Sequence, residues 1–224
     1  MPEGEIIMSV IKIENVSVEF VGEKVLQEIN LQMESKKIYG LIGRNGSGKS
    51  VLLRCIIGFL KPSSGDVWIN GKRIGKDMEF FDNIGFILNS PGFLPELSGF
   101  KNLCYLASIK KIADKKKIAE TMELVGLDPK SRKSVAKYSL GMRQRLAIAQ
   151  AIMEEPEILI LDEPMNGLDE DAVEEIRALL LELKEKGVLI IITSHNREDI
   201  DVLCDEVYRI KKGKMLRELP IISG

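Results

Sequence analysis

Gly43-Arg44-Asn45-Gly46-Ser47-Gly48-Lys49-Ser50 is the stretch of this sequence that decides the fold. Its spacing, G-x-x-x-x-G-K-[ST], is typical of a loop whose glycines let backbone N–H groups point inward around phosphate oxygens. In such a loop the lysine reaches the β- and γ-phosphates, and the hydroxyl of the last residue is placed to bind Mg²⁺. The sequence therefore predicts a nucleotide site, with Lys49 on the phosphates and Ser50 on the metal.

The residues on either side of this phosphate loop agree with that geometry. Ile38-Tyr39-Gly40-Leu41-Ile42 has the length and apolar composition of a short buried strand. Val51, which we include in the predicted nucleotide site, begins a run with apolar residues at helical spacing. The phosphates would then lie at a helix N-terminus, where free N–H groups and the helix dipole favour an anion.

Composition excludes several other classes of protein. With 224 residues, of which 45% are hydrophobic and 29% charged, the chain can bury a full core as one globular unit. Its formal net charge of −2 gives no basic footprint, so we expect no nucleic-acid partner. The three cysteines are odd in number and widely spaced, which favours reduced thiols in a cytosolic protein over disulfides or a metal site.

No apolar stretch of the sequence approaches the length that crosses a membrane. We therefore expect no direct membrane insertion. If the protein works at a membrane, a partner must hold it there.

The pattern of apolar residues predicts an α/β fold in three parts. Alternation over Val10–Phe20, and again at Ile29, Leu31 and Met33, predicts antiparallel strands at the N-terminal end. Asn70-Gly71 is a two-residue hairpin signal. Between about residues 90 and 155 the pattern becomes helical, with helices expected at Phe100–Ile112, Lys115–Val125 and Met142–Glu155.

The C-terminal third returns to strands. Ile158-Leu159-Ile160-Leu161 and Val188–Thr193 are apolar throughout, and a helix capped by Asp169 lies between them. Apolar strands joined by a helix predict a parallel sheet covered on both faces. The expected fold class is a phosphate-loop NTPase core with a parallel sheet, an N-terminal antiparallel β subdomain and an inserted α-helical subdomain.

Two acids and the only histidine follow the predicted strands. Asp162-Glu163 comes directly after one strand and His195 follows the next. Because ligands bind at the carboxyl ends of parallel strands, we expect these side chains to face the phosphates. Asp162 would hold Mg²⁺ and Glu163 would polarise the attacking water. Taken alone, an acid pair after a strand is more often a helix cap and a lone histidine is more often structural, but the phosphate loop favours function.

A further motif points to a family. Tyr138-Ser139-Leu140-Gly141-Met142-Arg143-Gln144 resembles the signature motif, usually written LSGGQ, of ATP-binding cassette (ABC) ATPases. The order of the phosphate loop, this segment, Asp162-Glu163-Pro164, a D-loop-like Asn166-Gly167-Leu168-Asp169 and Ser194-His195 is similar to that of the whole family. The resemblance extends from about Ile11 to Leu216.

The resemblance implies a two-chain ATPase. In the family, two domains close head to tail around two ATP molecules, and each phosphate loop faces the signature motif of the other domain. Ser139 and Gly141 would then contact the partner's nucleotide, and free N–H groups at that helix start would form a second anion site. Phe20 occupies the position of a ring that stacks on adenine, although a role in the core is equally compatible with the sequence.

The chain departs from the family pattern at three positions. Leu140 and Met142 replace a glycine and a glutamine of the signature motif. Asn89 stands where the family usually has a glutamine that helps to bind the metal. Asparagine keeps the amide oxygen but is shorter by one methylene group, so its reach to Mg²⁺ would be shorter.

The resemblance also implies an organisation and a function. Residues 1–224 would form a single ABC ATPase domain, with a core at about 10–89 and 156–216 and a helical subdomain at about 90–155. We expect an ATP-hydrolysing subunit that works as a homodimer, powers a separately encoded membrane permease and lies in the cytoplasm on the inner face of the membrane. The signature resembles exporters of peptide antibiotics and lantibiotics or of the multidrug type. The permease would dock near residues 89–106, although most of this apolar segment is better explained as the core of the helical subdomain.

Two alternatives stay open from the sequence. One is a soluble ABC ATPase that drives the assembly of a cytosolic complex without a membrane partner. The other is a module that binds ATP without hydrolysing it, against which the presence of Glu163 argues.

Overall fold

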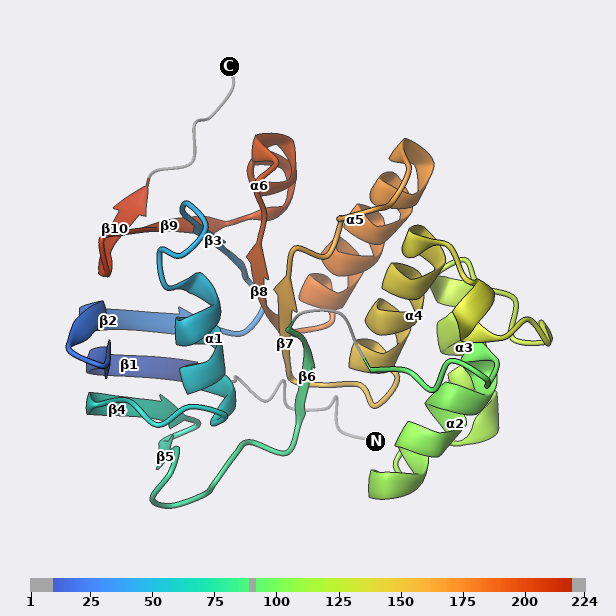
Figure 1. Ribbon diagram of the computed structural model, residues 1–224, viewed down its shortest axis with the longest axis horizontal. Helices are drawn as coiled ribbons and strands as arrows, with labels where there is room; N and C mark the ends of the chain where they lie inside the picture. Colours follow the sequence, from blue (N-terminus) through green and yellow to red (C-terminus); the bar gives the residue numbers. More distant parts are fainter. Residues whose placement is uncertain (1–9, 89–91, 219–224) are drawn as a thin grey trace, which may run out of the picture.

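The structure is a computed structural model that describes residues 10–88 and 92–218. Asn89 lies outside the described residues, so its role at a metal stays a prediction. Figure 1 shows the chain arranged as a β-rich part, a central sheet and a group of helices at the far side.

The described strands and helices follow one another in this order: β1 (Val10–Phe20), β2 (Glu23–Glu34), β3 (Ile38–Ile42), α1 (Lys49–Ile57), β4 (Ser64–Ile69), β5 (Lys72–Arg73), β6 (Ile84–Ile87), α2 (Gly99–Lys110), α3 (Lys115–Leu124), η1 (Val135–Lys137, a 3₁₀ turn), α4 (Leu140–Ile152), β7 (Ile158–Asp162), α5 (Glu170–Glu185), β8 (Leu189–Thr193), α6 (Arg197–Leu203), β9 (Glu206–Lys211) and β10 (Lys214–Glu218).

The N-terminal strands form an antiparallel sheet, as expected. Its order is β2-β1-β4-β5, and β1 pairs antiparallel with both neighbours. The predicted hairpin joins β4 to β5: Asn70 and Gly71 have φ values of 52° and 74°. A two-residue turn that follows the strand twist needs positive φ at both positions, and asparagine followed by glycine meets that need at low cost.

The second sheet has six strands in the order β10-β9-β3-β8-β7-β6. Its five strands from β9 to β6 are parallel, and β10 adds to β9 in the antiparallel sense. The predicted parallel sheet is therefore confirmed. Because β3, β7 and β8 are parallel neighbours, the segments that follow them meet at one edge.

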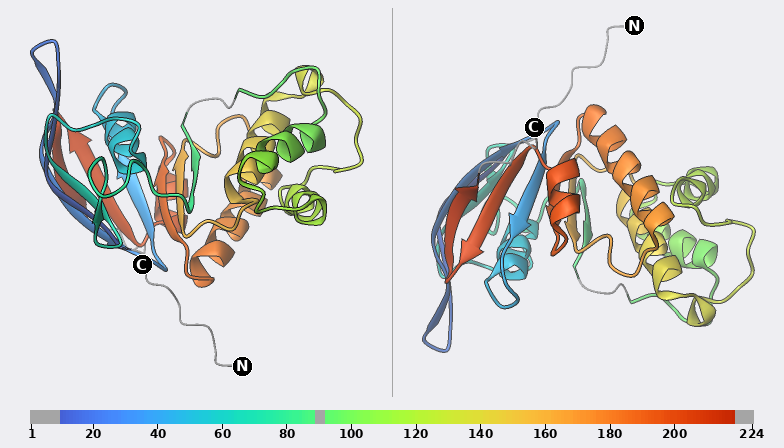
Figure 2. Two further views of the ribbon diagram at one scale, coloured as in Figure 1. Left: turned by 90° about the horizontal axis from the view of Figure 1, so that it is seen from below. Right: turned by 90° about the horizontal axis from the view of Figure 1, so that it is seen from above.

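Alternate residues of the parallel strands enter two different cores. In β7, Ile158 and Ile160 pack into the core shared with α1 and the antiparallel sheet, whereas Leu159 and Leu161 pack into the core shared with α4 and α5. This period of two follows from the pleat of a strand. The sheet is covered on both faces, as predicted, and Figures 1 and 2 show α1 on one side of it and α4 and α5 on the other.

The helices of the middle segment differ from the expected ones at their ends. The first begins at Gly99 after the cap Ser98 and stops at Lys110, because Lys111 takes a left-handed conformation with φ 59°. The expected Met142–Glu155 helix instead spans Leu140–Ile152, because Ser139 caps it and its last turn opens before Pro156. The proposed division into core and helical subdomain stays a prediction.

Membrane insertion has no candidate element in the part of the chain that the structure describes. No helix there combines the length and the apolar character that a bilayer crossing requires.

Candidate nucleotide-hydrolysis site

The phosphate loop connects β3 to α1 in a conformation that only glycine tolerates at two positions. Gly43 and Gly48 have φ values of 153° and 108°. A Cβ atom on Gly43 would lie 2.5 Å from the carbonyl oxygen of Ile210, and one on Gly48 would lie 2.7 Å from a methyl group of Leu26. The backbone can therefore curl tightly while it leaves its N–H groups toward the inside of the loop.

The buried Lys49 lies across this loop. Its Nζ donates a hydrogen bond of 2.7 Å to the carbonyl oxygen of Gly43. The hydroxyl oxygen of Ser47 is buried in the same loop and makes no hydrogen bond within the described residues. A buried ammonium that spans the loop and an unpaired hydroxyl fit a ligand that is anionic and rich in acceptors. Of the remaining predicted loop residues, Arg44, Asn45 and Gly46 are exposed and Val51 is half-buried.

Asp162 joins the loop to the edge of the sheet. One of its oxygens, Oδ2, accepts a hydrogen bond of 2.9 Å from the Ser50 hydroxyl. The other, Oδ1, accepts one of 2.5 Å from the Thr193 hydroxyl at the end of β8. The structure thus brings together two of the three residues that the sequence predicts for the metal.

A hydroxyl and a carboxylate are the hard oxygen ligands that Mg²⁺ prefers. Across residues 10–88 and 92–218, no cluster of three or more histidine, cysteine, aspartate or glutamate side chains could hold a metal by itself. Magnesium commonly uses one or two protein oxygens together with substrate phosphates. The Ser50 and Asp162 pair therefore fits Mg²⁺ that arrives with a nucleotide.

Glu163 and His195 contact each other at the same edge of the parallel sheet as Asp162. The backbone N–H of His195 donates to Oε2 of Glu163 over 3.2 Å, and Nε2 of the imidazole lies 3.0 Å from Oε1. Burial raises the pKa of Glu163 above its ordinary value, while the charges of His195 and Lys49 partly oppose that shift. Glu163 also has a φ of 53°, a conformation that L-residues adopt rarely and that is concentrated at functional sites.

Thr193 is a site residue that the sequence analysis missed. Its hydroxyl donates to Asp162 and accepts a hydrogen bond of 2.9 Å from the backbone N–H of Glu163. One buried side chain thereby holds both acids. One feature of the sequence could have identified Thr193: it is a hydroxyl residue at the end of an apolar strand, directly before Ser194 and His195.

Replacing Thr193 by valine is expected to lower the rate of ATP hydrolysis about tenfold, because the Asp162 carboxylate and the Glu163 backbone lose a shared partner. Steady-state phosphate release measures the effect. Thr121→Val is the matched control, since Thr121 is equally buried but, among the residues that the structure describes, its hydroxyl bonds only to the Lys117 carbonyl oxygen in α3. Similar losses in both variants would contradict a role for Thr193 in the site.

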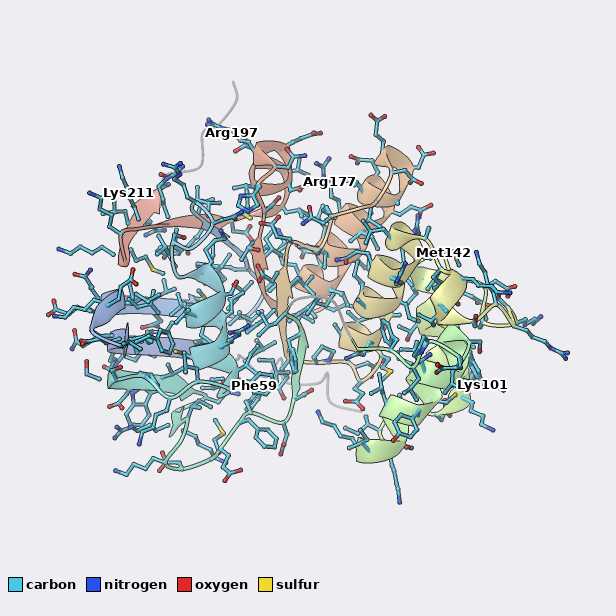
Figure 3. All side chains as sticks on the ribbon, in the orientation of Figure 1. Phe59, Lys101, Met142, Arg177, Arg197 and Lys211 are labelled. Carbon is cyan, nitrogen blue, oxygen red and sulfur yellow. The ribbon has the colours of Figure 1, made fainter. Side chains whose placement is uncertain are left out.

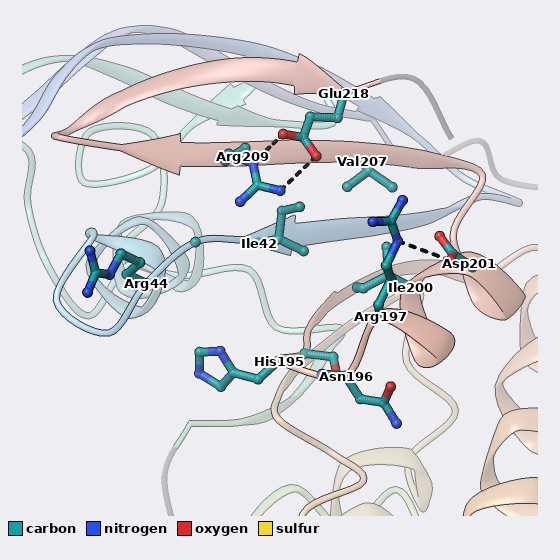
Figure 4. Close-up of a pocket in the computed structure, with 12 residues that line it drawn as sticks. Ile42, Arg44, His195, Asn196, Arg197, Ile200, Asp201, Val207, Arg209 and Glu218 are labelled. Carbon is teal, nitrogen blue, oxygen red and sulfur yellow. Dashed lines mark hydrogen bonds and ion pairs between the residues drawn. The ribbon is translucent and has the colours of Figure 1, made fainter. Parts of the chain in front are cut away.

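A cavity of about 320 Å³ opens beside the loop. Figure 4 shows the Arg44 and His195 side chains near the phosphate-loop end of this cavity, with the Arg209–Glu218 ion pair at its far wall. Access to His195 from solvent is therefore open on this side.

Phe20 lies elsewhere, at the end of β1, and is 44% exposed. The alternative that Phe20 belongs to the core is wrong.

The signature-like segment forms the start of α4. The Ser139 hydroxyl accepts a hydrogen bond of 3.1 Å from the Met142 N–H, so one of the N–H groups expected to be free has a local partner. A Cβ atom on Gly141 would lie 2.9 Å from the Gly167 carbonyl oxygen, so glycine permits this close approach. Leu140 is 62% exposed at the same surface, and Figure 3 marks Met142 at this end of α4.

The two candidate anion sites lie on opposite faces of the six-stranded sheet. The apolar residues of α1 pack into one core and those of α4 into the other. A hydrogen bond of 2.9 Å from Gln144 Nε2 to the Pro164 carbonyl oxygen ties α4 to the segment after Glu163. Helix α4, which begins after Ser139, therefore lies across the six-stranded sheet from helix α1, which begins at the phosphate loop.

A phosphate loop opposite an Asp-Glu pair at the carboxyl edge of a parallel sheet defines a phosphate-loop nucleoside triphosphatase. Within that class, residues 26–166 match the family described as ABC transporter. The chain belongs to this family, and it is an ATPase and the ATP-binding subunit of an ABC transporter.

Several curated relatives are similar over nearly the whole chain. The uncharacterized ABC transporter ATP-binding protein YybJ of Bacillus subtilis (strain 168) is 42% identical over 205 residues, which are 92% of this chain and 94% of YybJ. The bacitracin transport ATP-binding protein BcrA of Bacillus licheniformis is 41% identical over 214 residues, which are 95% of this chain and 70% of BcrA. BcrA of Enterococcus faecalis is 39% identical, with the same coverage.

Solved structures share the fold. The ATP-binding subunit of an ABC transporter superimposes with a TM-score of 0.85 at 25% identity, covering 93% of this chain and 89% of that chain. The dimeric structure of MJ0796, a bacterial ABC transporter cassette, has a TM-score of 0.84 at 25% identity and covers 96% of this chain and 100% of that chain. The expected ABC ATPase fold is confirmed.

Proposed function

We propose that this subunit hydrolyses ATP at the edge formed by the phosphate loop, β7 and β8, and that it powers a separate membrane permease from the cytoplasmic side. The observation that carries the proposal is the position of Glu163. Its carboxylate contacts His195, and it follows directly on Asp162, which is bonded to Ser50 of the phosphate loop. A base, a metal ligand and a phosphate cradle therefore meet at one place.

Each residue of the site has a distinct role in this proposal. Backbone N–H groups of residues 43–51 bind the phosphates, and Lys49 exchanges its bond to the Gly43 carbonyl oxygen for phosphate oxygens. Ser50 and Asp162, with Asn89, hold Mg²⁺. When bound, the metal neutralises charge on the phosphates. Glu163 accepts a hydrogen bond from the attacking water and orients it.

His195 fixes Glu163 and contacts the γ-phosphate from the other side. Phe20 stacks on the adenine ring, for which its exposure leaves it free. These assignments rest on the residue types and, except for Asn89, on their positions in the described structure.

A second copy of the chain would complete the site. Helix α4 lies across the six-stranded sheet from α1 and its phosphate loop, which supports a contact of Ser139 and Gly141 with a nucleotide held by another chain. The MJ0796 cassette, which shares the fold, has been solved as a dimer. Two copies arranged head to tail would place each Ser139 against the other's γ-phosphate.

The permease would dock in a groove between β6 and α2. This groove has a volume of about 270 Å³, and its wall includes Phe86, Leu106, Ile109 and Met153. At its wall, Lys110 Nζ donates a hydrogen bond of 2.6 Å to the Asp82 carbonyl oxygen and forms an ion pair of 3.3 Å with the Glu154 carboxylate. Because both apolar and charged side chains line the groove, it suits a short amphipathic helix of a partner.

Ile109→Glu is expected to lower recovery of the permease at least tenfold in affinity capture from detergent-solubilised membranes, because a charge would enter the apolar groove. Ile109 is 74% exposed, so the fold should tolerate the change. Leu124→Glu is the control, since Leu124 is 56% exposed on the neighbouring helix α3 and lies outside the groove. ATP hydrolysis by the isolated subunit should be unchanged in both variants. Equal recovery of the permease with both variants would exclude this docking site.

We assign the transported substrate to the peptide antibiotics and the direction to export. Two relatives with at least 39% identity over 95% of the chain are named for bacitracin transport. The permease recovered by capture allows the direct test, in which vesicles carrying both proteins should move a labelled peptide antibiotic only when ATP is supplied on the side of this subunit.

A further inference from the structure

A buried ion pair lies near His195 in the chain and has no part in the roles described above. Arg177 of α5 and Asp199 of α6 have side chains that are 5% and 2% exposed. Nε and Nη2 of Arg177 donate to the same oxygen, Oδ1 of Asp199, over 3.1 and 2.7 Å. Figure 3 places Arg177 between the two helices.

Such a pair contributes little to stability by itself. The cost of removing two charges from water is roughly offset by their mutual attraction and is seldom exceeded by it. Arg177 also contacts Glu174 and Glu198 through Nη1, but both glutamates are largely exposed and such contacts are weak. The pair between Arg177 and Asp199 is therefore better explained by what it holds in place.

The second carboxylate oxygen of Asp199 connects the ion pair to the segment that carries His195. Its Oδ2 accepts a hydrogen bond of 2.8 Å from the buried hydroxyl of Ser194. The same hydroxyl accepts one of 3.0 Å from the backbone N–H of Asn196. Ser194 lies between Thr193, which holds both acids, and His195, which contacts Glu163. The segment that carries His195 is thus bonded on one side to the acids and on the other to the ion pair.

We propose that Arg177, Asp199 and Ser194 are positioning residues that hold His195 against Glu163. This inference rests on the proposed role of His195. Arg177 fixes the orientation of the Asp199 carboxylate, and Asp199 fixes the Ser194 hydroxyl and with it the backbone turn before His195. Helix α5 begins directly after Asp169, its cap, in the D-loop-like segment. A displacement of α5 therefore reaches the backbone turn before His195 through the side chains of Arg177, Asp199 and Ser194.

Ser194→Ala is the sharpest test, because it removes the link to the site and leaves the ion pair whole. We expect kcat for ATP hydrolysis to fall about tenfold, with KM for ATP within about twofold of the unaltered protein. Asp199→Asn should give a similar loss. Glu174→Gln is the control, since it removes a partner of Arg177 that has no bond to Ser194, and it should leave kcat unchanged.

A double-mutant cycle with His195→Ala separates positioning from a general loss of stability. If Ser194 acts through His195, then Ser194→Ala should have no further effect on kcat in the His195→Ala protein. Multiplicative losses, or a Ser194→Ala rate within about twofold of the unaltered protein, would overturn the inference. If His195→Ala alone keeps the full rate, the proposed role of His195 fails first and the inference falls with it.

Discussion

Glu163→Gln is expected to lower kcat for ATP hydrolysis about a thousandfold while ATP binds as tightly as before. Glutamine has nearly the same shape as glutamate and keeps an oxygen for the His195 N–H, but it has no negative charge with which to polarise a water. The phosphate loop, which supplies most of the binding energy, is untouched. Phosphate release and an equilibrium titration with ATP measure the two quantities separately.

Glu170→Gln is the matched control, since this substitution also removes one negative charge. Glu170 is an exposed acid in the first turn of α5. It should hydrolyse ATP at the unaltered rate. Equal rates for Glu163→Gln and the unaltered protein would remove Glu163 from its assigned role and would favour a module that binds ATP without using it.

Lys49→Ala is expected to weaken ATP binding about a hundredfold, or about 2.7 kcal/mol. This substitution therefore acts on binding, whereas Glu163→Gln acts on the rate of hydrolysis. Lys49 places a buried ammonium inside the loop, 2.7 Å from the Gly43 carbonyl oxygen, and alanine leaves nothing to contact the β- and γ-phosphates. Isothermal titration with ATP measures the loss, and thermal unfolding without nucleotide checks the fold.

Lys36→Ala controls for the loss of one positive charge, since Lys36 is exposed and pairs only with the exposed Glu185 within the described residues. It should bind ATP normally. An affinity for ATP that is the same in Lys49→Ala and Lys36→Ala would contradict the placement of the phosphates on the loop.

Much of the fold follows from local patterns. The strand, loop and helix around Gly43–Ser50 each have a distinct period or composition, and the apolar runs at Ile158 and Val188 predict parallel strands because they are buried on both faces. Once those strands are parallel neighbours, the meeting of Asp162, Glu163 and His195 with the phosphate loop follows from chain direction alone. That part of the site was predictable for this reason.

Other parts depend on contacts between residues far apart in the chain. Thr193 and Asp162 are 31 residues apart, and Arg177 and Asp199 are 22 residues apart. Neither pair has a local signal, because a threonine in a strand or an arginine in a helix is usually explained by its own element. The sequence prediction placed the ends of two helices too far along the chain, whereas the structure ends them at Lys110 and Ile152. A single residue with a left-handed or non-helical backbone ends a helix even where the apolar spacing continues beyond it.

The measurement that tests the central claim most directly is the molecular mass of Glu163→Gln in solution, by light scattering, with and without ATP. If two chains complete each site, the mass should double when ATP is added. It should stay at the monomer value in Lys49→Ala at an ATP concentration that saturates Glu163→Gln but not this weaker binder. A Glu163→Gln protein that is saturated with ATP and still has the mass of one chain would contradict the account.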